Sequence, residues 1–240
     1  MQASSNAQIA SWKHLIGFLC IMAGLMALGF YAQHAAASEH GNQLASHGSA
    51  VQIYLVAGSM DWALLYYCWA GVHRRGGTLA TLSGGRWTSV RQLATDLALA
   101  VPFFLVWEGV ALGVSRLLGH SDAKTVDNLL PQTLPEIFLW IAVSATAGIC
   151  EEMAFRGYLQ QQLAALGGSV PVAVLGQALT FGVAHSYQGW KQVVVITILG
   201  ILYGTLAAWR RNVRINIIAH AFTDVWEGWL KFIFWPTLGG

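Results

Sequence analysis

Polar residues interrupt an apolar stretch in the second half of the sequence. The segment GICEEMAFRGYL, residues 148–159, contains Glu151, Glu152 and Arg156. A charged group inside a lipid-facing span costs roughly 3 kcal/mol on insertion scales, so three together need a structural or chemical reason. Glu152 and Arg156 are four residues apart, which places them on one helical face.

Two later apolar segments have polar residues at the same spacing. FGVAH contains Phe181 and His185, and HAFTD contains His220 and Asp224. Residues four apart lie on one face of a helix. We therefore expect three consecutive helices each to present a polar face.

These faces can meet at one depth. On two antiparallel helices joined by a turn at 167–171, Glu151 and His185 both lie roughly 21–24 Å from the turn. This requires the first helix to continue through the polar segment 159–166. His220 lies about 10 Å beyond the basic residues before it, which predicts a site about 10 Å below the cytoplasmic surface.

Two histidines and two carboxylates around water suit hydrolysis. A carboxylate in a low dielectric takes up a proton more readily, so Glu151 is the candidate general base. His185 would orient the water or share its proton. Arg156 would hold Glu152 ionised and fixed through a charge-assisted pair.

The third segment suits stabilisation of negative charge. His220 and Asp224 would donate to a developing oxyanion or orient donors toward it. For Asp224 this works only indirectly, because an ionised carboxylate has no proton to donate.

Zinc catalysis would use the same atoms. Two imidazoles and one carboxylate can bind catalytic Zn²⁺ with water in the open position. The ligands would be His185, His220 and either Glu151 or Glu152. The sequence does not separate metal-activated water from carboxylate-activated water. The HExxH and GxSxG motifs are absent, which disfavours the common helical zinc proteases and hydrolases with a serine elbow.

The composition predicts an all-α, polytopic membrane protein. The chain has 240 residues, of which 55% are hydrophobic and 10% are charged. A span needs roughly 20 apolar residues, and about seven stretches qualify: 15–33, 51–72, 93–118, 135–157, 170–188, 192–209 and 216–235. The net charge is only +2, and the basic residues are scattered along the chain, so the sequence does not indicate binding of nucleic acid. The partners expected from composition are membrane lipids.

Basic residues predict the orientation. If the spans alternate, one side receives Lys13, Arg74, Arg75, Arg86, Arg91, Arg156, Arg210, Arg211 and Arg214, and the other receives Arg116, Lys124, Lys191 and Lys231. The positive-inside rule then places the N-terminus in the cytoplasm.

The stretch AQHAAASEH, residues 32–40, is similar to a signal-peptidase site. The preceding apolar run is longer than a signal peptide needs, which favours retention of residues 1–36 as a true span.

Three acids in the first half stand apart from the motifs. Asp61, Asp96 and Glu108 are interpreted as isolated acids that have a structural partner or are protonated by burial. Asp96 is also close enough to a span end to be solvated.

The order EExxxR, FxxxH, HxxxD on successive spans resembles the CPBP family of intramembrane proteases, also called the Abi family. This family includes type II CAAX prenyl endopeptidases and bacteriocin-processing or bacteriocin-immunity proteins. The motifs stand here as Glu151-Glu152-Met-Ala-Phe-Arg156, Phe181-Gly-Val-Ala-His185 and His220-Ala-Phe-Thr-Asp224. The match covers residues 135–230.

This resemblance implies a membrane-embedded endopeptidase, commonly labelled a metalloprotease, whose site opens to the cytoplasm. Its first glutamate and second-motif histidine, here Glu151 and His185, are taken to activate water. The third-motif residues, here His220 and Asp224, are taken to stabilise the oxyanion. The substrate would be a peptide or membrane-anchored protein, prenylated in some members, and a bacterial inner membrane is the expected location.

The predicted organisation is one integral membrane domain. Residues 1–134 would form N-terminal helices of unassigned role, and residues 135–235 a catalytic helical core. Two other functions stay open: a non-catalytic immunity or peptide-binding protein, and a proton-coupled transporter using the same cluster. A transporter would favour inverted repeats, and no repeat is visible in the sequence. Buried ion pairs that only cross-link the bundle are the purely structural alternative.

Overall fold

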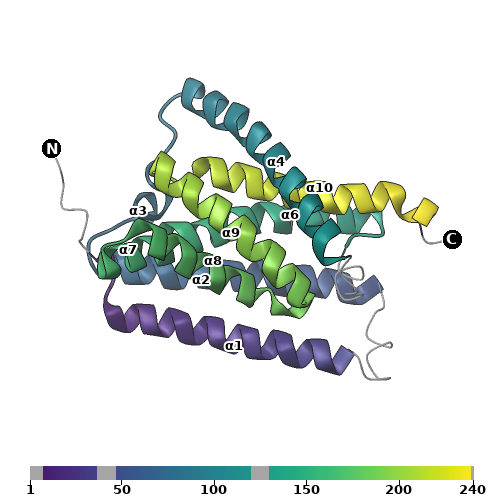
Figure 1. Ribbon diagram of the computed structural model, residues 1–240, viewed down its shortest axis with the longest axis horizontal. Helices are drawn as coiled ribbons and strands as arrows, with labels where there is room; N and C mark the ends of the chain where they lie inside the picture. The colour runs from purple at the N-terminus through teal and green to yellow at the C-terminus, as the bar shows by residue number, and fades with distance from the viewer. Residues whose placement is uncertain (1–7, 37–46, 120–129, 239–240) are drawn as a thin grey trace.

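The computed structural model describes residues 8–36, 47–119 and 130–238, and every regular element in these ranges is helical (Figure 1). The helices are α1 (Trp12–Ala36), α2 (His47–His73), α3 (Leu79–Ser83), α4 (Val90–Leu118), α6 (Leu134–Glu151), η2 (Glu152–Gln160), α7 (Gln161–Gly167), α8 (Val170–Ala184), η3 (Ser186–Gln188), α9 (Trp190–Arg210) and α10 (Arg214–Leu238). The all-α prediction is confirmed.

Each predicted span corresponds to a helix, but the helices differ in how well they suit a bilayer. Among the described residues, four helical stretches are long and apolar enough to cross a membrane: Trp12–Tyr31, Val90–Leu118, Leu134–Gly167 and Trp190–Arg210. The chain is therefore an integral membrane protein, while the number of seven spans stays a prediction. Part of the signal-like stretch, residues 37–40, lies outside the described residues.

The helix that carries Glu151 belongs to a long continuous helical stretch. It begins with a capping box, in which Thr133 Oγ1 accepts from the Glu136 amide and Glu136 Oε2 accepts from the Thr133 amide. This satisfies amides that a helix start leaves without partners. From there α6, η2 and α7 continue without a break to Gly167. The predicted continuation through residues 159–166 is confirmed.

The middle of this stretch is not an α-helix. The nine residues of η2 form a π-helix, and all of their side chains are buried. π-helical turns are rare and concentrate at functional sites. Nothing in the spacing of the sequence predicted this segment.

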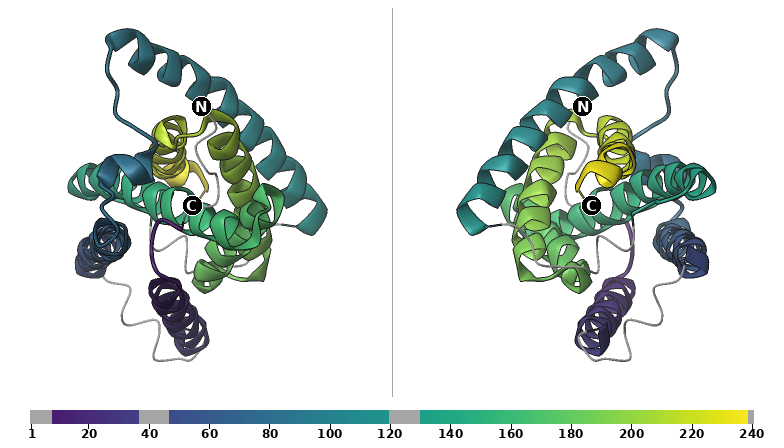
Figure 2. Two further views of the ribbon diagram at one scale, coloured as in Figure 1. Left: turned by 90° about the vertical axis from the view of Figure 1, so that its left-hand side faces the viewer. Right: turned by 90° about the vertical axis from the view of Figure 1, so that its right-hand side faces the viewer.

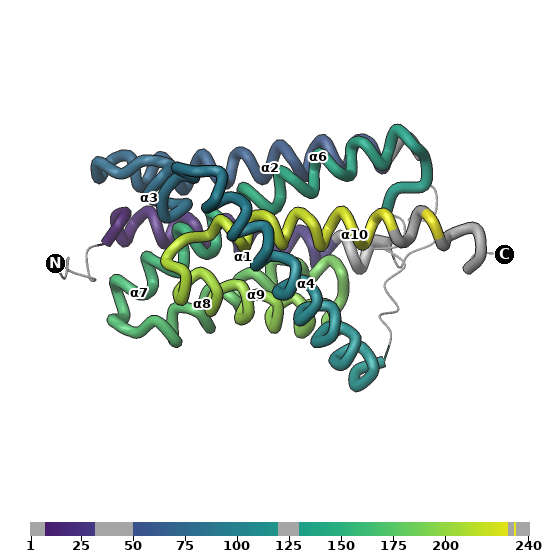
Figure 3. Tube along the Cα trace, turned by 90° about the horizontal axis from the view of Figure 1, so that it is seen from above, coloured from purple at the N-terminus to yellow at the C-terminus, as the bar shows by residue number. Residues whose placement is uncertain are grey.

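The helix α10 brings the third motif to the first. Figure 3 shows α10 running along the length of the molecule, with α2 and α6 on one side and α8 and α9 on the other. A Cβ on Gly148 of α6 would lie 2.9 Å from Cβ of Ala221 and 2.9 Å from the carbonyl oxygen of Ile217. Small residues allow two helices to approach closely, so Gly148 sets the distance between the first and third motifs.

Buried amides tie α8 and α9 into the same core. Gln177 donates to the Gly200 carbonyl at 2.7 Å, and Gln160 donates to the Gly204 carbonyl at 3.0 Å. A Cβ on Gly182 would collide with Thr197, so α8 and α9 are also in close contact. These bonds satisfy polar groups where water is excluded.

The N-terminal helices α1 and α2 lie at the edge of the bundle (Figure 2), and their side chains pack on this core. Phe18 of α1 contacts the rings of Phe155 and Tyr158, at centroid distances of 5.9 and 5.4 Å. The side chain of Gln162 bonds both the amide and the carbonyl of Ala10. On the other side, Tyr54 of α2 lies 5.5 Å from Trp140 of α6.

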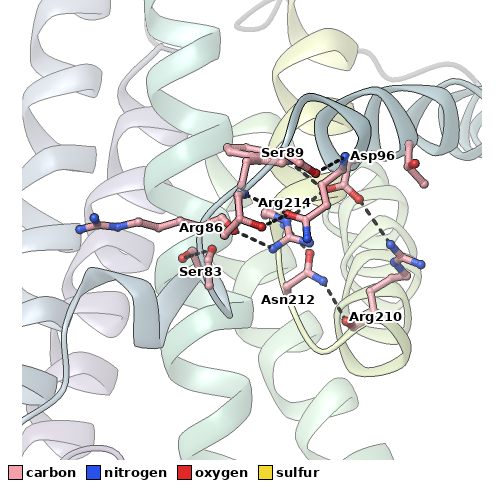
Figure 4. A network of polar contacts seen from close by, with 12 residues as sticks. Ser83, Arg86, Ser89, Asp96, Arg210, Asn212 and Arg214 are labelled. Carbon is pink, nitrogen blue, oxygen red and sulfur yellow. Dashed lines mark hydrogen bonds and ion pairs between the residues drawn. The ribbon is translucent and has the colours of Figure 1, made fainter.

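Asp96 at the start of α4 joins two loops at one end of the molecule (Figure 4). Its carboxylate accepts from Arg214 Nε at 2.9 Å, Trp87 Nε1 at 2.9 Å and Arg210 Nη2 at 3.4 Å. Asp96 is only 1% exposed. The prediction of a structural partner for Asp96 is confirmed, and the alternative that Asp96 is simply solvated is wrong because two arginines and an indole enclose it.

We expect Gly157→Ala to destabilise the fold. A Cβ on Gly157 would lie 2.2 Å from the carbonyl oxygen of Leu82, and a backbone atom has little room to move. Overpacking of this kind costs about 1–3 kcal/mol, so the thermal midpoint in detergent should fall. Gly109→Ala is the matched control, because nothing lies within 4 Å of its Cβ position. Equal midpoints for the two variants would contradict the close contact between α3 and η2.

Candidate active site

Glu152 is the meeting point of the first and third motifs. Its Oε1 accepts from Arg156 Nη1 at 2.7 Å and from His220 Nδ1 at 2.9 Å. The side chains of Glu152 and Arg156 are both 0% exposed. The expected contact between Glu152 and Arg156 is present, and it extends to a histidine on α10.

Aromatic rings cover the arginine. The guanidinium carbon of Arg156 lies 4.3 Å from the ring centre of Phe181 and 5.2 Å from that of Tyr203. Tyr203 in turn stacks on the imidazole of His220, with centroids 5.5 Å apart and planes 21° apart. Ring faces attract a desolvated cation, so Arg156 is held by one carboxylate and two rings.

These contacts define the orientation of His220. An ionised carboxylate only accepts hydrogen bonds, so Nδ1–H of His220 donates to Glu152. The opposite nitrogen, Nε2, lies 3.7 Å from Oε2 of Glu151 and 3.7 Å from Oδ2 of Asp224. One edge of the imidazole is therefore fixed in the core, and the other faces two further carboxylates.

The two adjacent glutamates differ in their access to solvent. The side chain of Glu151 is 17% exposed, whereas that of Glu152 is 0% exposed. Asp224, on the other side of His220 Nε2, is 29% exposed. The carboxylates of Glu151 and Asp224 are therefore partly exposed, whereas that of Glu152 is enclosed by protein.

His185 lies at the end of α8 rather than within it. The helix ends at Ala184, and His185 is its C-cap residue with φ −93° and ψ 17°. Nδ1–H of His185 donates to the carbonyl of Phe181 at 2.8 Å, because a carbonyl oxygen has no proton to give. The lone pair of Nε2 is therefore available. Phe181 links His185 to the rest of the site, since its ring contacts both His185 and His220.

The structure brings in an acid that the sequence left isolated. Asp61 of α2 is within electrostatic range of Glu151, His220 and Asp224. The interpretation of Asp61 as an isolated acid is wrong, because α2 packs along α6: a Cβ on Gly58 would contact Val143 and Thr146 at 3.8 and 3.9 Å.

Two more residues near the site were not singled out in the sequence. Tyr187 of η3 is within electrostatic range of Glu151 and Asp224, and Glu227 of α10 is within range of Asp224, His220 and Glu108. Glu227 lies three residues after Asp224 on the same helix, and this i, i+3 spacing was the one signal that could have identified it.

Two of the predicted zinc ligands lie close together, since Nε2 of His220 is 3.7 Å from Oε2 of Glu151. Within residues 8–36, 47–119 and 130–238, no three or more His, Cys, Asp or Glu side chains are arranged to hold a metal ion. Nδ1 of His185 and Nδ1 of His220 are engaged in hydrogen bonds, which leaves Nε2 of each ring as the nitrogen that could bind a metal. The described side chains are therefore not arranged as a zinc site in this structure. The zinc set stays a prediction from sequence.

Comparison with known families gives a match over the segment that carries all three motifs. Residues 133–226 match the family model described as type II CAAX prenyl endopeptidase Rce1-like. This segment is therefore similar to the Rce1-like family. The resemblance to the CAAX protease family is thereby confirmed, and it indicates an intramembrane protease that acts on a peptide or protein. Comparisons with curated proteins and with solved structures gave no match.

We expect Arg156→Met to unfold the site. The substitution leaves Glu152 buried without its cation, and breaking a buried pair by removing one partner costs about 3–5 kcal/mol. Thermal unfolding in detergent measures the loss. Arg75→Met is the control, because Arg75 is exposed in the turn after α2. If Arg156→Met and Arg75→Met melted at the same temperature, the buried pair would not hold this site together.

Proposed function

We propose that the protein is an intramembrane endopeptidase in which Glu151 activates water. The observation that carries the proposal is the division between two neighbouring glutamates. Glu152 is sequestered by Arg156 and His220, while Glu151 is accessible to water and lies beside His220 Nε2. A positioned carboxylate beside water is the arrangement that general base catalysis needs.

The proposed reaction balances with protein groups alone. Glu151 takes a proton from water as the water oxygen bonds to the carbonyl carbon of the substrate. The proton then passes to the amine nitrogen as the C–N bond breaks, which yields a carboxylic acid and an amine. The Nε2 lone pair of His185 is available to accept a hydrogen bond from the same water.

His220 and Asp224 would act on the developing negative charge. His220 donates Nδ1–H to Glu152, so Nε2 carries a proton only when the ring is an imidazolium. That proton then points away from the core toward Glu151 and Asp224. A preorganised donor of this kind stabilises an oxyanion without reorganising. Asp224 would orient His220 rather than donate, since its carboxylate accepts only.

The proposed substrate is a peptide or membrane-anchored protein, including prenylated proteins, cleaved near the cytoplasmic face of a bacterial inner membrane. Two basic loops support a common cytoplasmic side. The amide of Val213 donates to the carbonyl of Ser83, and Arg214 reaches the carbonyl of Arg86. The loops that the positive-inside rule assigned to one side are thus in contact, which supports a cytoplasmic N-terminus.

We expect Glu151→Gln to abolish proteolysis. A glutamine cannot take up the proton of water, and loss of a general base costs about 10²–10⁴-fold in rate. The measurement compares the N-termini of proteins in membranes that carry wild type or variant at equal level. Glu108→Gln is the matched control, since it neutralises an acid of α4 that belongs to none of the three motifs.

The expected result is a set of N-termini present with wild type and Glu108→Gln but missing with Glu151→Gln. Identical profiles for all three proteins would overturn the protease proposal and favour a peptide-binding or transport function.

We expect cleavage to survive removal of zinc. If the carboxylate of Glu151 activates water directly, treatment of the purified protein with a strong zinc chelator should leave the rate within about twofold. Loss of cleavage on chelation, with recovery on adding Zn²⁺, would replace this mechanism by metal-activated water.

A further inference from the structure

The proposed site has many acceptors and few donors. Glu151, Asp224 and Asp61 contribute carboxylates that lie within electrostatic range of one another. The Nδ1 proton of His185 is used by Phe181, and that of His220 by Glu152. Hydrolysis of a peptide bond develops an oxyanion that needs donors aimed at it. Of the two motif histidines, His220 is the one whose second nitrogen, Nε2, faces these carboxylates and can donate when the ring is an imidazolium.

Tyr187 adds a neutral donor at the same place. Its ring lies 6.0 Å from the ring of His185, and its phenol is within electrostatic range of Glu151, Asp224 and Asp61. Gln188 Nε2 donates to the phenol oxygen at 2.9 Å. Because the phenol oxygen is the acceptor in this bond, the bond leaves the hydroxyl proton available to donate.

The backbone at Tyr187 is held from two directions. The amide of Gln188 donates to the carbonyl of His185 at 2.9 Å, which closes the 3₁₀ turn directly after the second motif. From the other side, α1 passes close by: a Cβ on Gly29 would lie 3.2 Å from Cβ of Tyr187. A donor is effective when its position is fixed before the reaction, and this turn provides such a position.

We propose that Tyr187 is a further catalytic residue, whose phenol donates a hydrogen bond to the oxyanion formed when water adds to the substrate carbonyl. The phenol keeps its proton throughout, so the atom balance of the hydrolysis is unchanged. This inference rests on the proposed protease function. The proposal also assigns a role to the N-terminal helix α1, because Gly29 contacts the turn that carries Tyr187.

The test compares turnover of the full-length protein and of Tyr187→Phe in detergent. The probe is a fluorescence-quenched peptide that spans a cleavage site mapped by the Glu151-dependent termini. Because the oxyanion exists only in the transition state, loss of its donor lowers kcat and leaves KM unchanged. Removal of one such donor costs on the order of 100-fold in kcat.

Two further variants separate donation from packing. Tyr66→Phe removes a phenol oxygen from an exposed tyrosine of α2 and should keep wild-type kcat. Tyr187→3-fluorotyrosine keeps a hydroxyl donor and should restore kcat to within a few-fold of wild type. Recovery by the fluorinated residue is the result that a merely structural role of the ring would not give.

Each outcome has a distinct meaning. If wild type cleaves and Tyr187→Phe retains its kcat, or if KM rises while kcat holds, Tyr187 is not the donor and the protease proposal stands. If wild type gives no Glu151-dependent termini at all, the protease proposal fails and the role of Tyr187 fails with it.

Discussion

The structure of the site depends on one buried carboxylate that accepts from two helices. Oε1 of Glu152 accepts a hydrogen bond from Nη1 of Arg156, which lies on the same helical stretch, and another from Nδ1 of His220, which lies on α10. In a low dielectric, a carboxylate stripped of water must be paired and hydrogen-bonded, and a lone charge there is strongly destabilising. The ion pair therefore constrains the geometry: α10 must stay where His220 can reach Glu152, and Gly148 and Ala221 allow that approach.

This constraint gives different surroundings to groups that are chemically the same. Glu151 and Glu152 are neighbours in sequence, yet the side chain of Glu151 is partly exposed and that of Glu152 is fully buried. The same division applies to the two nitrogens of His220, of which Nδ1 is anchored and Nε2 faces Glu151 and Asp224. The buried pair of Glu152 and Arg156 would thus orient the residues proposed to react, Glu151 and His220. A buried polar network is destabilising when its hydrogen bonds are incomplete, so the stability of the fold and the orientation of His220 depend on the same contacts.

Local periodicity in the sequence predicted contacts within one helix, but it missed contacts that tertiary packing decides. Spacing of four predicted the contact between Glu152 and Arg156, and apolar run length predicted the long helices. Neither signal predicted that Asp61 lies near His220, because that depends on how α2 packs along α6. The π-helical form of η2 and the end of α8 before His185 were also missed, since no residue type in these segments marks either feature.

The most direct test of the division between the two glutamates measures thermal unfolding and peptide turnover for Glu151→Gln and Glu152→Gln side by side. We expect Glu151→Gln to unfold at the wild-type temperature but to lose turnover, because its carboxylate acts on water. Glu152→Gln should unfold at a lower temperature, because Arg156 and His220 lose the charge that anchors them. If Glu152→Gln were as stable as wild type, or if Glu151→Gln kept its turnover, the division of roles between the two glutamates would be contradicted.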